Sequence, residues 1–239
     1  MVPTEERQSV PCPKVKLDST APHIHPAIDW QTVAANDNPL ILYKSPDGEV
    51  EVGIRRWEQG NTDFFCASDC LCYFQRGRGL FRRNIGESIE VIPGTAVHFK
   101  EGWRGTLESS QPLEASYMKC AGGPADRTPV LRDVLTAAPL KDWGAIPTMI
   151  EGTSFTAGIL LSREPNGRAE SGIWTCTPGL WRCEVTSDEY CHFLDGSCTY
   201  THESGESIYI EPDTLAFFPR GWKGSCNVRR TMRKVYMIR

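Results

Sequence analysis

The sequence repeats itself once, at an offset of 119 residues. Residues 40–119 align with residues 159–238 without a gap and share about 24 identities among 80 pairs. The shared residues include turn-forming glycines, as in Gly102-Trp103 against Gly221-Trp222. A unit of about 80 residues is too long for the repeat of a solenoid. The duplication therefore predicts two tandem copies of one small barrel or sandwich.

The pattern of residues inside each copy is that of β-structure. Short runs rich in β-branched and aromatic residues, such as "EVEVGIRRW" and "KVYMI", alternate with turn residues at intervals of roughly 8–12 residues. This spacing is typical of an all-β barrel or sandwich. Only "TPVLRDVLTAA", between the copies, has helical character, and Thr128-Pro129 is its expected start.

These patterns divide the chain into four parts. We predict an N-terminal arm over residues 1–39, a first barrel over 40–120, a linker with a short helix over 121–158 and a second barrel over 159–239. The arm and the linker have no counterpart in the repeat. We therefore expect them to cover barrel ends or to hold one barrel against the other.

Charge and composition limit the partners. The net charge is −4 and the basic residues form no block, so the chain lacks the electrostatic footprint of a protein that binds nucleic acid or an anionic membrane. A small-molecule ligand is the favoured partner. The first thirty residues lack the pattern of a secretory signal, and no apolar run approaches the roughly 20 residues of a membrane span. We expect a cytoplasmic protein.

The chain contains ten cysteines. In a short secreted chain this number would indicate a disulfide framework. Here Cys66, Cys70, Cys72, Cys183 and Cys191 lie inside apolar, strand-like runs of a longer chain without a signal. We interpret them as buried free thiols.

The second copy contains an ordered set of motifs. It has "GxW…PG" at its start, then "DE…FLDG" and "GESIYIEPDTLAFFPRGWKG", and it ends with "RKVY". With these motifs it resembles the cupin superfamily, specifically the small cupins named after (S)-ureidoglycine aminohydrolase. The first copy keeps "GESIEVIPGTAVHF", "GWRG" and "YM". The resemblance implies a bicupin, in which two jelly-roll barrels each enclose a cavity lined by inward-facing side chains.

The resemblance also implies where a metal would bind. Metal-binding cupins place two histidines with one residue between them, a glutamate seven residues before a glycine, and a third histidine on a later strand. The corresponding residues are Cys183, Val185, Glu189 and Gly224 in the second copy, and Phe64, Cys66, Cys70 and Gly105 in the first. Because neither copy has the usual ligands, we expect no cofactor. The alternative is zinc or manganese held through Cys183, Glu189 and Cys191.

A lysine and a glutamate distinguish the second copy from the first. In the terminal strand Lys234 shares its parity with apolar residues, so it is expected to face into the barrel. Glu189 occupies an inward metal-ligand position of the same barrel. A buried charge without a partner is costly, which predicts contact between the two. The first copy has Cys70 and Ala115 at these positions, so both charges are absent together.

The candidate site therefore lies in the second barrel. We predict Glu189, Lys234 and Tyr236 as catalytic residues. The residues predicted to bind the ligand are Trp174, Trp181, Cys183, Cys191, Trp222 and Arg230. The first barrel, with Phe64, Cys66, Cys70, Cys72 and Phe74, is expected to be packed or to hold an apolar pocket. The pair His23 and His25, in the arm, has the spacing of metal ligands on a strand, but we interpret it as part of the arm.

Three functions are compatible with these features. The leading hypothesis is a bicupin without the usual metal centre that binds a small polar metabolite in its second barrel, with hydrolysis, isomerisation or elimination as the chemistry. The first alternative is a metal-dependent enzyme like (S)-ureidoglycine aminohydrolase. The second alternative is a non-catalytic bicupin for ligand sensing or scaffolding. A homodimer is an open option, because a fused pair of barrels either replaces such a dimer or builds on it.

Overall fold

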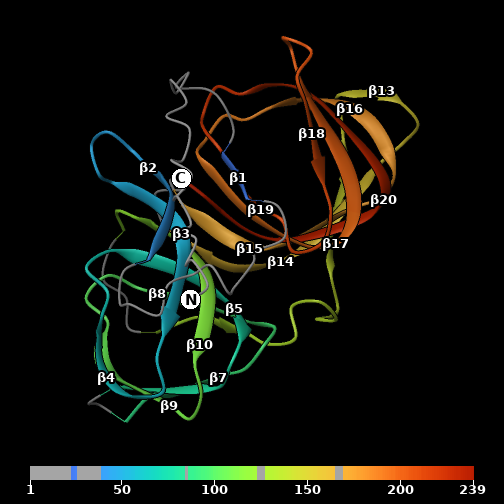
Figure 1. Cartoon of the computed structure of the whole chain (residues 1–239). Helices are drawn as coiled ribbons and strands as arrows, with labels where there is room; N and C mark the ends of the chain where they lie inside the picture. The colour runs from blue at the N-terminus through green and yellow to red at the C-terminus, as the bar shows by residue number, and fades with distance from the viewer. Residues whose placement is uncertain (1–22, 26–38, 84–85, 123–126, 165–168) are drawn as a thin grey trace, which may run out of the picture.

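The computed structural model describes residues 23–25, 39–83, 86–122, 127–164 and 169–239 (Figure 1). All regular elements in these ranges are strands, and their pairings are antiparallel, which confirms the predicted all-β fold class. Two barrels lie side by side, the first drawn from blue to green and the second from yellow to red (Figure 1). Among the described residues, none forms a helix that is long and apolar enough to cross a membrane.

The first barrel consists of two facing sheets. Its strands are β2 (Leu40–Lys44), β3 (Val50–Trp57), β4 (Gly60–Phe65), β5 (Asp69–Arg76), β6 (Gly79–Arg83), β7 (Ser88–Val91), β8 (Thr95–Phe99), β9 (Arg104–Ser109), β10 (Leu113–Cys120) and β11 (Val130–Leu131). One sheet has the order β11-β8-β5-β10-β3-β2 and the other β4-β9-β6-β7. Aromatic side chains, among them Phe64, Phe74, Phe81, Phe99 and Trp103, fill the space between the sheets.

The second barrel is built around two long strands, β17 and β20, that pair with each other. Its strands are β12 (Lys141–Ala145), β13 (Met149–Glu151), β14 (Phe155–Arg163), β15 (Glu170–Cys176), β16 (Gly179–Glu184), β17 (Glu189–His202), β18 (Ser207–Ile210), β19 (Leu215–Phe218) and β20 (Lys223–Ile238). β17 aligns with β5 and β6 of the first copy, and β20 aligns with β9 and β10. In the first copy Pro112 occupies the position of Thr231, and proline cannot donate a hydrogen bond to a neighbouring strand. The strand is therefore interrupted there.

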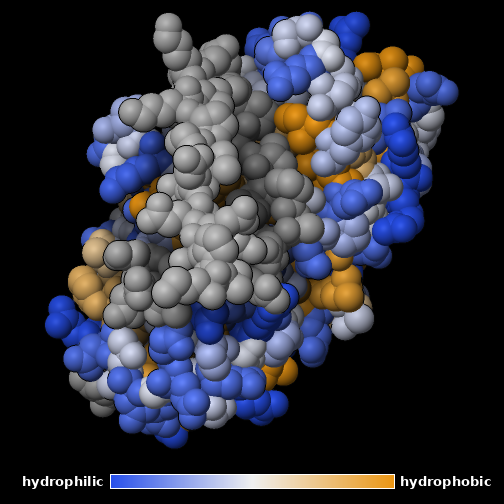
Figure 2. Space-filling model, in the orientation of Figure 1, coloured by the Kyte–Doolittle hydropathy of each residue, from blue (hydrophilic) through white to orange (hydrophobic). Residues whose placement is uncertain are grey.

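A third apolar core lies between the barrels and contains residues of both. Members from the first barrel include Val52, Leu71 and Met118, and members from the second include Tyr190 and Val235. On the face drawn in Figure 2, hydrophilic side chains predominate over the first barrel and the apolar residues between them are scattered. Most buried apolar side chains thus lie inside the two barrels or at the contact between them.

Polar pairs cross the same contact. His98 of the first barrel bonds Ser171 of the second, with 2.7 Å between Nδ1 and Oγ. Ser116 of the first barrel bonds both His192 Nδ1 at 3.1 Å and Tyr190 Oη at 2.7 Å in the second. Both histidines are buried, so these hydrogen bonds belong to the contact between the barrels.

The predicted short helix is absent from residues 127–158, the part of the linker in which it was expected. Val130–Leu131 forms β11 and pairs with β8, and Val134 N donates to Gly94 O. The apolar residues of "TPVLRDVLTAA" thus pack along an edge of the first barrel. Asp133 has a φ of 51°, a left-handed conformation in which a right-handed helix cannot continue. Further along the linker, β12 and β13 pair with β14 and β16 of the second barrel.

Within the N-terminal arm, only residues 23–25 and 39 are described. His23–His25 forms β1, which pairs with β19 of the second barrel. The rest of the arm and the side chains of this histidine pair lie outside the described part of the chain, so the predicted role of the pair stays open.

The glycines that replace the third histidine are required by close backbone contact. A Cβ atom at Gly105 would lie 2.0 Å from Arg82 O, and one at Gly224 would lie 2.1 Å from Thr201 O. Both positions therefore need glycine so that the neighbouring strand can approach.

Candidate functional site

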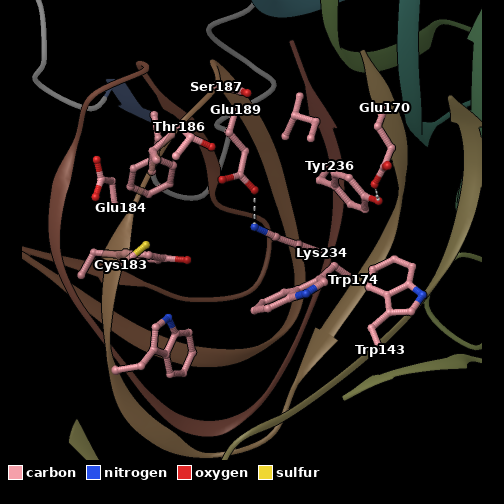
Figure 3. Close-up of a pocket in the computed structure, with 15 residues that line it drawn as sticks. Trp143, Glu170, Trp174, Cys183, Glu184, Thr186, Ser187, Glu189, Lys234 and Tyr236 are labelled. Atoms are coloured by element: carbon pink, nitrogen blue, oxygen red, sulfur yellow. Dashed lines mark hydrogen bonds and ion pairs between the residues drawn. The ribbon is translucent and has the colours of Figure 1, made fainter. Parts of the chain in front are cut away.

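The second barrel encloses a cavity of about 410 Å³ (Figure 3). It is lined by Trp143, Glu170, Trp174, Trp181, Cys183, Glu184, Val185, Thr186, Ser187, Glu189, Tyr200, Phe218, Lys234, Tyr236 and Ile238. Most of these side chains come from β15, β16, β17 and β20, and the linker adds one tryptophan from β12. Because successive residues of a strand point to opposite faces, alternate positions of these strands meet inside the barrel.

The predicted contact between Lys234 and Glu189 is present. Lys234 Nζ donates to Glu189 Oε1 at 2.6 Å and to Cys191 Sγ at 3.3 Å. The Cys191 thiol in turn donates to Glu189 Oε1 at 3.4 Å. The lysine side chain is 8% exposed and that of the glutamate 22% exposed. In Figure 3 the ammonium group points across the barrel toward the carboxylate.

Lys234 stays charged despite its burial. Burial alone lowers its pKa, but the contacts with Cys191 and Glu189 outweigh burial and raise the pKa. Its ammonium also lies 4.8 Å from the ring centre of Trp174, a favourable cation–π distance. The barrel therefore holds a fixed positive charge at neutral pH.

A second carboxylate lies on the cavity wall. Glu170 Oε1 accepts a hydrogen bond from Tyr236 Oη at 2.5 Å, and Glu170 Oε2 accepts one from Arg163 Nε at 2.7 Å. Burial, together with this bond to the carboxylate, raises the pKa of Tyr236. The sequence-based prediction does not include Glu170. The repeat could have indicated it, because the aligned residue of the first copy, Glu51, is also a glutamate.

Aromatic side chains form much of the remaining wall. Trp174, Trp181 and Cys183, three of the residues predicted to bind the ligand, line the cavity. Trp143 completes the wall from the linker, which has no counterpart in the repeat.

Glu184 also lines the cavity, and it forms an ion pair with Lys223 at 3.2 Å between the charged atoms.

Three predicted ligand-binding residues do not line the cavity. Trp222 is fully buried and packs against the rings of Phe218 and Tyr200, so it belongs to the core. Cys191 is buried beside Lys234 and acts through that contact. Arg230 is exposed and faces Asp195 at 3.3 Å, because irregular pairing of β17 with β20 in this region breaks the alternation on which the prediction depended.

The weak metal alternative has an unsuitable donor set. Among the described residues, no three His, Cys, Asp or Glu side chains are grouped so as to hold a metal ion. Lys234 Nζ already contacts both Glu189 and Cys191, so a second cation there would be repelled. Burial, followed by the charge of Glu189, raises the pKa of Cys183 to about 12, and burial raises that of Cys191. Metal binding there would require both thiols to lose their protons.

The first barrel has a smaller cavity, of about 120 Å³. Phe64, Cys66, Cys70 and Cys72 line it as expected, whereas Phe74 belongs to the packed core. The cavity is not wholly apolar, because Arg55 and Lys119 also line it. All nine described cysteines of the two barrels are free; of the five predicted to be buried, Cys66, Cys70, Cys72 and Cys191 are buried and Cys183 is partly buried.

Comparisons with known proteins extend this description. Residues 163–236 match the EutQ-like cupin domain family. The chain has no match among the curated proteins. A protein of unknown function from Pseudomonas syringae pv. tomato has a similar structure, with a TM-score of 0.72 and 14% identity over 91% of this chain and 93% of that chain.

Two further solved structures have the same fold. A Cupin 2 conserved barrel domain protein from Leptotrichia buccalis has a TM-score of 0.63 and 10% identity, over 94% of this chain and 98% of that chain. A salicylate 1,2-dioxygenase from Pseudaminobacter salicylatoxidans has a TM-score of 0.63 and 12% identity, over 92% and 84%. Identities this low show a shared fold and leave the activity open. The second barrel is thus similar to a cupin domain over residues 163–236, and the solved structures share the fold of most of the chain.

Proposed function

We propose that the second barrel binds a small, flat metabolite bearing a carboxylate or amide group, and that Glu189 and Lys234 move a proton on it. The observation that carries this proposal is the buried ammonium–carboxylate pair on the wall of the cavity of about 410 Å³. A volume of this size is typical of sites for small metabolites.

Lys234 supplies the recognition of an oxygen atom. An ammonium group has three donors, and Glu189 and Cys191 accept two of them. The remaining donor is available to a carbonyl or carboxylate oxygen of a ligand in the cavity. Because the lysine is held by its neighbours, little side-chain entropy is lost when the ligand binds.

Glu189 supplies the acceptor for a proton. The contacts of the carboxylate with Lys234 and Cys191 both use Oε1, and the side chain, which lines the cavity, remains 22% exposed. Its second oxygen can therefore take a proton from a bound molecule while Lys234 stabilises the negative charge that develops. Hydrolysis, isomerisation and elimination all require such a transfer. The rings of Trp143, Trp174 and Trp181 provide flat surfaces against which a planar ligand can stack.

The test is a ligand screen read by thermal unfolding, with a matched variant. We expect some carboxylates or amides in a metabolite library to raise the Tm of the wild-type chain, because a ligand that binds only the folded state stabilises it. The double variant Glu189→Cys with Lys234→Ala carries the residues of the first barrel at these two positions. We expect it to fold and to show no shift with the same ligands. An equal shift in the double variant would contradict the proposed site.

The proton transfer needs a separate measurement. With a ligand from the screen, NMR in deuterium oxide is expected to show deuterium incorporation or turnover by the wild-type chain. The variant Glu189→Gln should bind the ligand and lose this activity, because an amide cannot accept the proton. If the wild-type chain binds the ligand without any exchange or turnover, the result would contradict the proposed proton transfer and support the non-catalytic alternative.

The metal-dependent alternative makes opposite predictions. It requires near-stoichiometric Mn, Fe, Ni or Zn in protein purified without a histidine tag, and ammonia release from ureidoglycine when Mn is added. We expect neither result, because the ammonium group of Lys234 already contacts both Glu189 and Cys191.

A further inference from the structure

Two basic side chains line the cavity of the first barrel and have no part in the proposed function of the second. Arg55 lies on β3 and Lys119 on the neighbouring strand β10, and both line the cavity of about 120 Å³. Their aligned residues in the second copy, Trp174 and Ile238, line the larger cavity. Both positions therefore face inward in both barrels. Among the described residues that line the smaller cavity, no carboxylate accompanies the two cations.

Arg55 has no acidic partner among the described residues. Its Nε atom is buried and lacks a hydrogen-bond acceptor there. The guanidinium carbon lies 5.0 Å from the ring centre of Trp57, a cation–π contact that positions the group without satisfying its donors. The adjacent Arg56 instead pairs with Glu58 at 3.2 Å and with Glu114 at 3.6 Å. Because a buried donor without an acceptor is unfavourable, the surroundings of Arg55 favour an anion from outside the chain.

The charge of Lys119 is already balanced. Its Nζ donates to Glu51 Oε1 at 2.9 Å, and the same carboxylate accepts a hydrogen bond from Tyr117. An ammonium group has three donors, so Lys119 can still donate to a ligand. Two cations and one carboxylate leave one positive charge beside the cavity. A ligand with a single negative charge would balance it.

We propose that the first barrel binds a small carboxylate of the size of formate or acetate, with Arg55 as its main contact and Lys119 as a second donor. The planar guanidinium group offers two parallel N–H donors that match the two oxygens of a carboxylate. A cavity of about 120 Å³ is below the roughly 300–1,000 Å³ of ordinary ligand sites, so only a ligand of few heavy atoms fits. The hydroxyl group of Ser68, which also lines the cavity, is a further donor.

The second barrel solves the same electrostatic problem within the chain. There the buried cation is Lys234, and its Nζ lies 2.6 Å from Glu189 Oε1. The first copy has Ala115 and Cys70 at these two positions and carries its cation at Arg55. The anion that the second barrel supplies from its own chain must therefore come from the ligand in the first.

The test is a titration of the full-length chain with sodium formate and with sodium acetate, at an ionic strength held constant with sodium chloride. The readout is the proton–nitrogen NMR signal of the Arg55 Nε–H group, identified by its absence in Arg55→Gln. We expect this signal to move saturably with a Kd of about 1 mM, because a ligand of three or four heavy atoms cannot bind much more tightly than roughly 0.1 mM. A signal that does not move, or that moves equally with chloride alone, would overturn the proposal.

Variants separate this site from the second barrel, where Lys234 also attracts carboxylates. In the double variant Glu189→Cys with Lys234→Ala, calorimetry should still detect the binding of formate and acetate. Adding Arg55→Gln to this background should weaken the binding at least about tenfold, since a charged donor is lost. Arg56→Gln is the matched control, because it removes the same charge from the next residue of β3 and should leave the affinity unchanged. Equal affinity with and without Arg55→Gln, or loss of all binding in the double variant, would show that the first barrel is not the site.

Stability and ligand size provide two further checks. Arg55→Gln removes a cation without a partner, so its ligand-free Tm should be no lower than that of the wild type. A clearly lower Tm would show that the guanidinium group has a stabilising partner within the chain, which would contradict the proposal. Benzoate should leave the Arg55 signal unmoved, because its ring is too large for the cavity. A shift with benzoate at similar affinity would contradict the choice of a small ligand.

Discussion

The two barrels place their cavities at equivalent positions but line them differently. Each has a tyrosine, on β10 or on β20, that donates to a glutamate on the neighbouring strand of the same sheet, β3 or β15. Tyr117 Oη donates to Glu51 at 2.8 Å in the first barrel, and Tyr236 Oη donates to Glu170 at 2.5 Å in the second. Because this bond occurs in both copies, we assign it to the barrel scaffold. The differences between the cavities are therefore the better guide to function.

The difference in cavity size follows from single positions. Trp57 and Phe64 project into the first barrel, where the second has Cys176 and Cys183. Two large rings are thus present in the first barrel where the second has thiols, which contributes to the difference between cavities of about 120 and about 410 Å³. The duplicated scaffold thus carries a small thiol-lined cavity in one copy and a metabolite-sized polar cavity in the other.

The largest expected effect concerns the pair that only the second barrel has. Lys234→Ala leaves Glu189 largely buried without its partner, and we expect a loss of about 3 kcal/mol in the free energy of unfolding. Glu189→Cys alone leaves the ammonium unpaired and should cost a similar amount. The double variant, which installs both residues of the first barrel, should lose much less than the sum. A double-mutant cycle by urea unfolding measures the coupling free energy of the pair. Additive losses would show that the contact does not contribute to stability.

The next effect concerns an aspartate that both copies share in different surroundings. Asp69 and Asp188 each accept a bond from an equivalent backbone amide, Glu101 N and Arg220 N, at 2.8 Å. Asp69 also accepts bonds from Lys100 and from His98 Nε2, at 3.2 Å for the latter. Burial raises the pKa of Asp69, but bonds from His98 and Lys100 prevail and lower it from 3.8 to about 2.

We therefore expect Asp69→Asn to cost about 2 kcal/mol at pH 7. Because the folded-state pKa is below the unfolded value, this contribution is complete above about pH 4 and is lost as the pH falls toward 2. The wild type and Asp69→Asn should accordingly converge in stability in acid. Asp188→Asn should cost about 1 kcal/mol or less, since it loses only the shared bond. Urea unfolding between pH 2 and 7 measures both, and equal losses for the two variants would argue against a special role of Asp69.

A smaller effect tests whether the shared tyrosines are scaffold. Tyr117→Phe and Tyr236→Phe each remove one hydrogen bond to a partly buried carboxylate, and we expect a loss of about 1 kcal/mol in each. Similar losses, with ligand-induced Tm shifts retained in Tyr236→Phe, would support the scaffold role. Loss of ligand binding in Tyr236→Phe alone would instead support the predicted catalytic role of Tyr236.

Much of the fold follows from the sequence because the duplication doubles the evidence for each strand and turn. The Lys234–Glu189 contact is also predictable, since two buried charges that are absent together from the other copy indicate a pair. Trp143 is not predictable, because it comes from the unrepeated linker. Arg230 was predicted to face the cavity from the alternation of side chains along its strand. Irregular pairing of β17 with β20 changes which side its side chain faces, and the residue pattern does not reveal this irregularity.

The smallest expected effect concerns the rim of each cavity. Glu184 pairs with Lys223 in the second barrel, and the aligned residues of the first, Phe65 and Arg104, form a cation–π contact with 4.6 Å between the guanidinium carbon and the ring centre. Exposed contacts of either kind contribute little, so the double variant Glu184→Phe with Lys223→Arg should change the unfolding free energy by less than about 0.5 kcal/mol. Ligand binding should nonetheless respond, because Glu184 lines the larger cavity and Lys223 does not. Removing this negative charge should tighten the binding of carboxylates relative to amides. Unchanged relative affinities, measured by calorimetry, would show that the choice of ligand is made at Lys234 alone.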